Sequence, residues 1–333
     1  MRGFWILGLL LLLASALSLC WGGARTGPVE LLAWMQQRLP LEEAEYVQMV
    51  MSSIRFPRTL GAIVVGAALG LAGALLQTVT RNILAETDIL GINGGAALGV
   101  VIGISFFSAS SMISWQLFAI AGALVGTSLV MWTASRGQEG LQPLRLVLSG
   151  LAIASTFQGL TGYILLQQQN SLDQYRFWVL GSLSGISTTA VLSILPACGM
   201  AFVLTCWLYR GLHALQLGDD VASSLGHRPA VLRLLAVAAV TLLTGCSIAL
   251  TGPVVLLGLA APYFARGFSK GDMALFLLYS SLTGSVILIC ADLLARTVIA
   301  PYETPLSVIV VFLGTPILIR LARSSDFTGE ASA

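Results

Sequence analysis

Very few side chains in this chain of 333 residues have the types and spacing that catalysis needs. The single lysine, Lys270, does not follow a Gly-x-x-x-x-Gly motif, so the loop that cradles nucleotide phosphates in P-loop ATPases is absent. The two histidines, His213 and His227, lack the spacing of a zinc-protease helix. We therefore predict that the chain is not an enzyme and that any ATP hydrolysis belongs to a partner.

The cysteines do not have the spacing of a disulfide framework or a metal centre. No two of them form a Cys-x-x-Cys pair, and each lies in or at the end of an apolar run. We interpret them as small buried side chains and expect no metal and no cofactor on this chain. They are Cys20, Cys198, Cys206, Cys246 and Cys290.

Ionisable residues are absent from the centres of the long apolar runs. Asp88, Arg145 and Asp292 stand at the ends of such runs. Carriers driven by protons or ions usually place such groups inside the helix bundle, so the pattern disfavours this class. A carrier that binds its ion through backbone carbonyls stays an alternative.

The composition requires a lipid environment for the elements that position these residues. Hydrophobic residues make up 56% of the chain and charged residues 10%, too little polar surface for a soluble globule. Since a bilayer core takes about 20 apolar residues per helix, the apolar runs count the crossings. We predict an all-α membrane protein with about ten transmembrane helices, as one permease domain over residues 1–333. The runs are 3–22, 59–79, 89–107, 113–135, 146–166, 190–208, 234–250, 254–265, 273–294 and 306–319.

Three of these runs have individual features. Residues 3–22 exceed the apolar core of a signal peptide, so we expect a retained first helix. The runs at 254–265 and 306–319 are short and carry Pro262 and Pro316, which predicts broken or partly re-entrant helices. Glycine rows four residues apart, such as Gly66 with Gly70, predict close helix packing.

The distribution of basic residues predicts the orientation. With the N-terminus in the cytoplasm, eleven basic residues lie inside and six outside, as the positive-inside rule requires. We therefore expect both termini in the cytoplasm. The net charge of +2, without a block of like charges, gives no indication of nucleic acid as a partner.

Two stretches are polar enough to lie outside the bilayer, residues 24–58 on the outer side and 209–232 on the inner side. In the second, Asp219 or Asp220 is suited to cap a short helix and Gly226 to end it. The apolar side chains of this stretch suggest that it docks against something; they are Leu215, Leu217, Val221 and Leu225.

Nine segments in order resemble the FecCD family of ABC-importer permeases, which handles ferric siderophores, haem and cobalamin. The match runs nearly end to end, and the phrase GLAGALLQTVTRN at 70–82 looks most like the ferric enterobactin branch. The segments are 55–60 (RFPRTL), 66–77 (GAALGLAGALLQ), 81–85 (RNILA), 90–97 (LGINGGAA), 177–183 (FWVLGSL), 217–226 (LGDDVASSLG), 252–253 (GP), 291–296 (ADLLAR) and 313–316 (LGTP).

The resemblance implies an importer in the bacterial inner membrane. Its partners would be a second permease subunit, identical or different, two ATPase subunits that bind ATP and Mg²⁺, and a periplasmic substrate-binding protein. The cargo would be a ferric siderophore, with the catecholate type favoured. A haem or cobalamin permease is the alternative within the class; a secondary carrier or a membrane receptor would be the alternatives outside it.

The resemblance also implies roles for individual residues. Coupling to the ATPase would fall to Leu217, Gly218, Asp219, Asp220, Ala222, Leu225 and Gly226. Docking of the binding protein would use Arg55, Arg58 and Arg296. The gate and pathway would include Gln77, Asn82, Leu84, Gln142 and Pro143.

Three positions depart from the family pattern. Ile83 replaces a proline, Glu86 with Thr87 replaces an acidic residue and proline, and Tyr263 replaces a histidine. These departures affect the local geometry of the gate and leave the permease interpretation intact.

Overall fold

The computed structural model describes residues 2–22, 27–136, 143–299 and 302–323. Within these ranges the chain forms helices joined by short connections and contains no strand, as the all-α prediction requires. The elements are α1 (Arg2–Cys20), α2 (Pro28–Met35), α3 (Leu41–Val50), η1 (Met51–Arg55), α4 (Phe56–Thr80), η2 (Thr87–Leu90), α5 (Ile92–Phe107), α6 (Met112–Ser135), α7 (Pro143–Gln167), α8 (Gln169–Val179), α9 (Thr188–Leu217), α10 (Asp219–Ser224), α11 (Pro229–Thr251), α12 (Leu257–Ser269), α13 (Met273–Thr297) and α14 (Leu306–Arg323).

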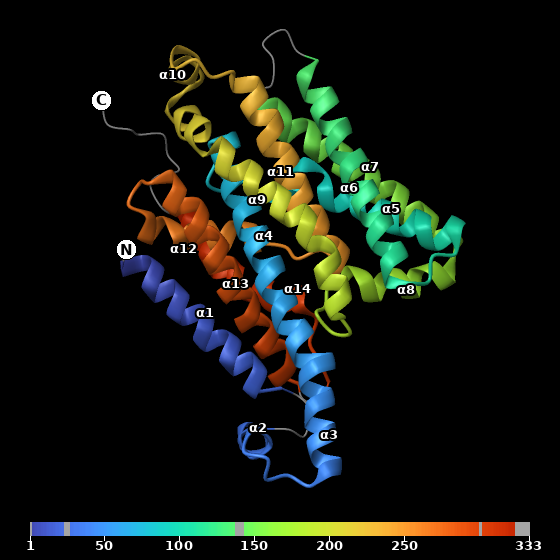
Figure 1. Ribbon diagram of the computed structural model, residues 1–333. Helices are drawn as coiled ribbons and strands as arrows, with labels where there is room; N and C mark the ends of the chain where they lie inside the picture. The colour runs from blue at the N-terminus through green and yellow to red at the C-terminus, as the bar shows by residue number, and fades with distance from the viewer. Residues whose placement is uncertain (1, 23–26, 137–142, 300–301, 324–333) are drawn as a thin grey trace.

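Helix α4 forms the centre of the bundle (Figure 1). It packs against α9, α11, α12 and α13, and every side chain from Ala68 to Thr80 is buried. The helix ends where Arg81 adopts the left-handed conformation, with φ of 50°. Because α4 touches so many neighbours, any displacement of it must be shared with them.

Glycines allow the backbone of α4 to touch its neighbours. A Cβ atom on Gly73 would lie 1.8 Å from the carbonyl oxygen of Gly258 in α12. On Gly70 it would lie 2.2 Å from the carbonyl oxygen of Ser280 in α13. The predicted role of the glycine rows as close-packing surfaces is therefore confirmed for these helices.

Seven helical stretches among the described residues are long and apolar enough to cross a bilayer. Helices α5 and α14 are shorter apolar helices, and α12 has 13 residues. Each of the ten apolar runs overlaps one of these ten helices. One detail was wrong: α12 continues as a helix through Pro262 and α14 through Pro316, and the break near the first of these runs lies at residues 252–256, before α12.

The two extramembrane stretches are more helical than predicted. At one end of the bundle, α3 and η1 run directly into α4, and α2 lies beside α3 beyond the end of α1 (Figure 1). At the opposite end, α9 continues to Leu217 and α11 begins at Pro229. The separate connector is thus α10 with its flanking turns, which is shorter than the predicted 209–232.

Candidate functional site

The connector around α10 is a tight turn fixed by its glycines. Gly226 has φ of 82°, and its N–H donates to the carbonyl of Ser223 at 3.0 Å. The next N–H, of His227, donates to the carbonyl of Ala222 at 3.0 Å. These two bonds form the helix-ending motif that requires a left-handed residue, so Gly226 ends α10 as predicted.

One face of α10 is apolar and exposed. Leu217, Val221 and Leu225 are 65%, 40% and 62% exposed. Ala222 on the opposite face is completely buried against the bundle. An exposed apolar surface at the end of a bundle, fixed in place on its other side, has the form of a docking site for another protein.

The carboxylate of Asp219 joins α10 to the helices around it. Arg233 of α11 donates two hydrogen bonds to it, at 2.8 and 2.7 Å, and Arg81 at the end of α4 donates another. Arg81 also donates to the carbonyl of Leu215 in α9, at 2.9 and 2.6 Å. The prediction that Asp219 caps the helix was wrong, because Gly218 occupies the cap position and the carboxylate binds the two arginines instead.

The two arginines determine the charge state of this carboxylate. Partial burial acts to raise the pKa of Asp219, but the hydrogen bonds and charge of Arg233, with those of Arg81, outweigh burial and hold the pKa below its usual range. Asp219 is therefore ionised at neutral pH, and α4, α9, α10 and α11 meet at one anionic group.

The predicted gate residues after α4 form a compact turn beside this carboxylate. The side-chain carbonyl of Asn82 accepts a hydrogen bond from the N–H of Leu84 at 2.9 Å, which closes the turn. One helical turn earlier, Gln77 is buried and accepts a bond from Arg266 of α12 at 2.8 Å. The three residues thus lie at the same end of the bundle as α10.

Of the two remaining gate residues, Gln142 and Pro143, the structure describes only the second. Gln142 lies outside the described residues, and Pro143 begins α7, where its fixed φ is favourable. Glu86 accepts a hydrogen bond from the N–H of Leu256, which has φ of 67°. The turn after α4 is therefore linked to the helix break before α12.

The three arginines predicted to dock a binding protein lie at the opposite end and are buried. Arg55, Arg58 and Arg296 are 2%, 5% and 4% exposed. Arg55 donates to the carbonyl of Leu19 at 2.7 Å, which ties α1 to η1. They are therefore not free surface charges, and the expectation of an open basic docking surface has to be corrected. Their role in docking stays a prediction.

Arg58 and Arg296 share the carboxylate of Asp292. Arg58 of α4 donates to it at 2.8 Å, and Arg296 donates from one turn further along α13. Arg58 also donates to Glu303, in the connection before α14, at 2.7 Å. Burial acts to raise the pKa of Glu303, but Arg58 and Arg296 outweigh it and lower the pKa. Buried charges held in this way are tolerated only as a paired set.

Sequence reasoning missed the groups that hold the site together. None of these groups was given a partner from the sequence; they are Arg81, Arg233, Arg266, Asp292 and Glu303. Apart from the pairing of Asp292 with Arg296, four residues apart, their pairings span 14 to 245 residues of sequence, so no local pattern could reveal them. Among the described residues, no group of three or more His, Cys, Asp or Glu side chains could hold a metal ion.

Comparison with known proteins identifies the architecture. The model of the FecCD transport family matches residues 10–324. The chain belongs to the FecCD transport family. Among its relatives, the ferric enterobactin transport system permease protein FepD of Escherichia coli is 40% identical over 269 residues, which cover 81% of this chain and 80% of FepD. FepG, the second ferric enterobactin permease of that organism, is 32% identical and covers 94% of each chain.

A solved structure agrees with this assignment. An ABC transporter of proposed metal-chelate type, in an inward-facing conformation, matches with a TM-score of 0.83 at 25% identity. The match covers 96% of this chain and 98% of the other. The FecCD assignment and the bundle geometry together make this chain a multi-pass, all-α membrane permease.

Proposed function

We propose that this chain is the membrane-spanning subunit of an ABC importer that carries a ferric catecholate siderophore into the cytoplasm. The observation that carries the proposal is the 40% identity to FepD over four fifths of both chains. Permeases for hydroxamate and for citrate chelates also match, at 34% to 36% identity, so the chelate type is the finer part of the proposal.

The geometry at α10 supports energy coupling to a separate ATPase. An exposed apolar face on α10 would enter a groove on the ATPase, and the carboxylate of Asp219 would pass the resulting displacement to α4, α9 and α11. ATP and Mg²⁺ would bind the ATPase subunits alone. The seven predicted coupling residues, from Leu217 to Gly226, all belong to this turn.

The same geometry fits a bacterial inner membrane orientation with both termini in the cytoplasm. The exposed basic residues gather at the α10 end, where Arg136, Arg210, Arg228 and Lys270 face solvent. Fewer are exposed at the α2–α3 end, where Arg38 and Arg176 are the main ones. This asymmetry is the positive-inside pattern with α10 in the cytoplasm.

A second permease subunit would complete the translocation path. FepD and FepG both resemble this chain, which favours a heterodimer, whereas two copies of this chain remain the alternative. A periplasmic binding protein would deliver the chelate at the α2–α3 end, near Arg58 and Arg296.

Uptake of radiolabelled iron chelates into proteoliposomes tests the proposal. The vesicles hold the permease chain with its partner permease and ATPase, the binding protein is outside, and ATP is inside. We expect ATP-dependent uptake of a ferric catecholate that excess unlabelled catecholate reduces and ferric citrate does not. Uptake that ignores ATP and stops when the ion gradient collapses would contradict the importer; uptake of ferric citrate alone would contradict only the catecholate.

A further inference from the structure

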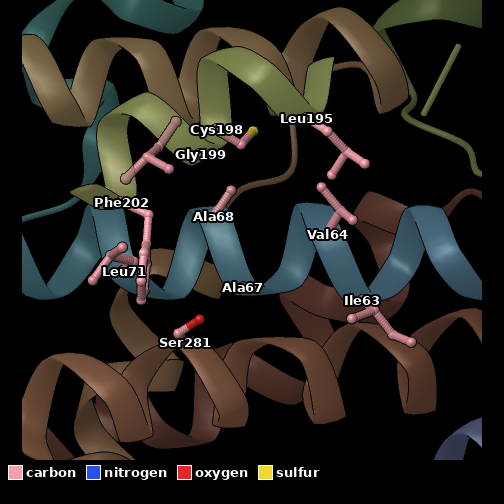
Figure 2. A pocket seen from close by; sticks show the side chains of 11 residues that line it. Ile63, Val64, Ala67, Ala68, Leu71, Leu195, Cys198, Gly199, Phe202 and Ser281 are labelled. Atoms are coloured by element: carbon pink, nitrogen blue, oxygen red, sulfur yellow. The ribbon is translucent and has the colours of Figure 1, made fainter. Parts of the chain in front are cut away.

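Two cavities lie along one pair of helix faces outside the site described above. The first, of about 290 Å³, has an almost wholly apolar lining from α4, α9 and α13, with one residue from α11 (Figure 2). Leu195, Gly199 and Phe202 of α9 lie on one side of it and Ser281 of α13 on the other, while α4 forms the floor between them.

The second cavity, of about 300 Å³, opens at the α10 end of the same two helices. Tyr209, Arg210 and His213 of α9 line one side. The turn before α13 and the first residues of α13, from Gly271 to Ala274, line the other. The apolar cavity and this one, called the polar cavity for its Arg210, His213 and Asp272 side chains, are therefore both bounded by α9 and α13.

Helical periodicity places both cavities on a single stripe. Along α9, Gly199, Phe202, Cys206, Tyr209 and His213 follow at intervals of three or four residues and so share one face. On α13, Ala274 and Ser281 are seven residues apart and also share a face. A ligand lying along this stripe would contact both cavities; we call it the α9–α13 groove.

The length of the groove matches one leaflet of a bilayer. Gly199 and Arg210 are eleven residues apart on α9, which is about 16 Å along the helix. Half of the hydrocarbon core of a bilayer is about 15 Å thick. If the polar cavity lies at the level of the lipid headgroups, the apolar cavity therefore lies near the middle of the bilayer, where the acyl chains end.

The charge of the polar cavity favours an anion. Arg210 is exposed, and its one hydrogen bond among the described residues goes to the hydroxyl of Tyr209 at 3.0 Å. Lys270 is exposed in the adjoining turn. The single carboxylate lining the cavity, Asp272, accepts the N–H of Leu275 at 3.0 Å and caps α13, so one negative charge stands against the two positive charges of Arg210 and Lys270.

We infer that the α9–α13 groove binds a phospholipid with an anionic headgroup, whose phosphate contacts Arg210 at the α10 end and whose acyl chain fills the apolar cavity between α4, α9 and α13. Basic pockets between transmembrane helices on the cytoplasmic side recognise such headgroups. A lipid in this position contacts α4, α9 and α13. The inference goes beyond the proposed cargo and needs no particular chelate.

Native mass spectrometry of the purified full chain tests the inference. The chain is equilibrated with mixed micelles that contain equal amounts of phosphatidylglycerol and phosphatidylcholine with identical acyl chains, and the retained lipids are counted. We expect retained phosphatidylglycerol to exceed phosphatidylcholine, and Arg210→Gln to lower the excess about fivefold, as one basic residue near the surface contributes about 1 kcal/mol. Arg210→Lys should keep the preference.

The chain offers a matched control for each part of the groove. Arg136 also ends a long helix and stacks on an aromatic ring, of Trp132, at 4.0 Å, so Arg136→Gln should leave the preference unchanged. Gly199→Leu would fill the apolar cavity, because nothing lies within 4 Å of its added Cβ, and should lower retention of both lipids about tenfold. Gly162, on α7, has equally open surroundings, and Gly162→Leu should leave lipid retention unchanged.

Equal retention of the two lipids by the unmodified chain would overturn the inference. Equal losses of the phosphatidylglycerol preference in Arg210→Gln and Arg136→Gln would also overturn it, because they would indicate an unspecific effect of surface charge. Equal losses of lipid retention in Gly199→Leu and Gly162→Leu would overturn it as well. Elution of each variant as a monodisperse peak shows that the losses do not come from unfolding.

Discussion

The carboxylate of Asp219 joins α10 to α11 and to the end of α4, and Arg81 extends this link to α9. Its partners differ in their surroundings: the side chain of Arg233 is 7% exposed, whereas that of Arg81 is 36% exposed. Removing the negative charge would take from the buried Arg233 the opposite charge that Asp219 supplies, and losing one partner of a buried ion pair is costly. The carboxylate is therefore worth more as the partner of Arg233 than as a surface charge.

The first prediction concerns this carboxylate. Asp219→Asn keeps the size of the side chain and removes its charge, and we expect a loss of about 1–2 kcal/mol in stability, discounted for the partial exposure of the site. We also expect slower ATP-driven uptake. The adjacent Asp220 is exposed, so Asp220→Asn is the matched control for stability. Thermal unfolding in detergent and vesicle uptake measure the two effects; equal melting temperatures of the two variants would contradict the structural role of Asp219.

The second prediction concerns Glu303 and pH. Because the folded protein lowers the pKa of Glu303, its pairing with Arg58 stabilises the fold above the pKa of an unfolded glutamate, about 4.3, and is lost as the pH falls through the lower folded value. We expect Glu303→Gln to lower the melting temperature at pH 7 and to have a smaller effect at pH 3. A difference between the variant and the unmodified chain that does not change with pH would contradict this linkage.

At the scale of elements, the contact between α4 and α12 depends on the absence of a side chain at Gly73. The third prediction is that Gly73→Ala is strongly destabilising, by about 1–3 kcal/mol or more, because its Cβ would overlap the carbonyl of Gly258. Gly162→Ala, in open surroundings on α7, should be neutral or slightly stabilising since alanine favours a helix. Melting temperatures of the purified variants measure the difference, and an unaffected Gly73→Ala would mean that the two helices pack less closely.

The ten apolar helices were predictable because each depends on local composition. A run such as 234–250 needs only enough apolar residues to cross the bilayer, and α11 forms there as expected. The turn at Gly226 was predictable for a similar reason, as a left-handed position favours glycine. The continuity of α14 through Pro316 was not predictable, because the effect of this proline depends on how the surrounding helices accommodate it.

The connections between elements were much less predictable. Arg58 meets Glu303 across 245 residues of sequence, and Arg81 meets Asp219 across 138. A single sequence places such residues near helix ends without stating which ends meet. Arg58 therefore appeared to be a free surface charge, whereas packing of α4 against α13 buries it.

At the scale of the whole molecule, α4 joins the two ends of the bundle. Arg58 at one end binds Asp292 and Glu303, and Arg81 just past the other end binds Asp219. The two arginines are 23 residues apart, about 35 Å of helix. Because α4 is tightly packed along this length, it moves as a rigid element, and a displacement of α10 has a direct route to the opposite end.

The fourth prediction tests whether that route starts at the apolar face of α10. Val221 and Leu225 are one helical turn apart, so they share this face, while Ser223 lies on another side of the same short helix. Val221→Glu would place a charge in a contact that must become dry, which we expect to weaken capture of the ATPase by about tenfold or more. ATP-driven uptake should fall in parallel, while the melting temperature stays within about 2 °C because the exposed side chain supports no internal packing.

Ser223→Glu adds the same charge to the same helix and should change neither ATPase capture nor uptake. Equal losses in the two variants would indicate a general effect of negative charge at this end of the bundle. If Val221→Glu instead loses uptake while it still captures the ATPase, the apolar face of α10 is not needed for docking. Its role would then be to transmit movement after the ATPase has bound. Measuring capture and uptake on the same preparations therefore separates docking at α10 from the movement that α4 passes on.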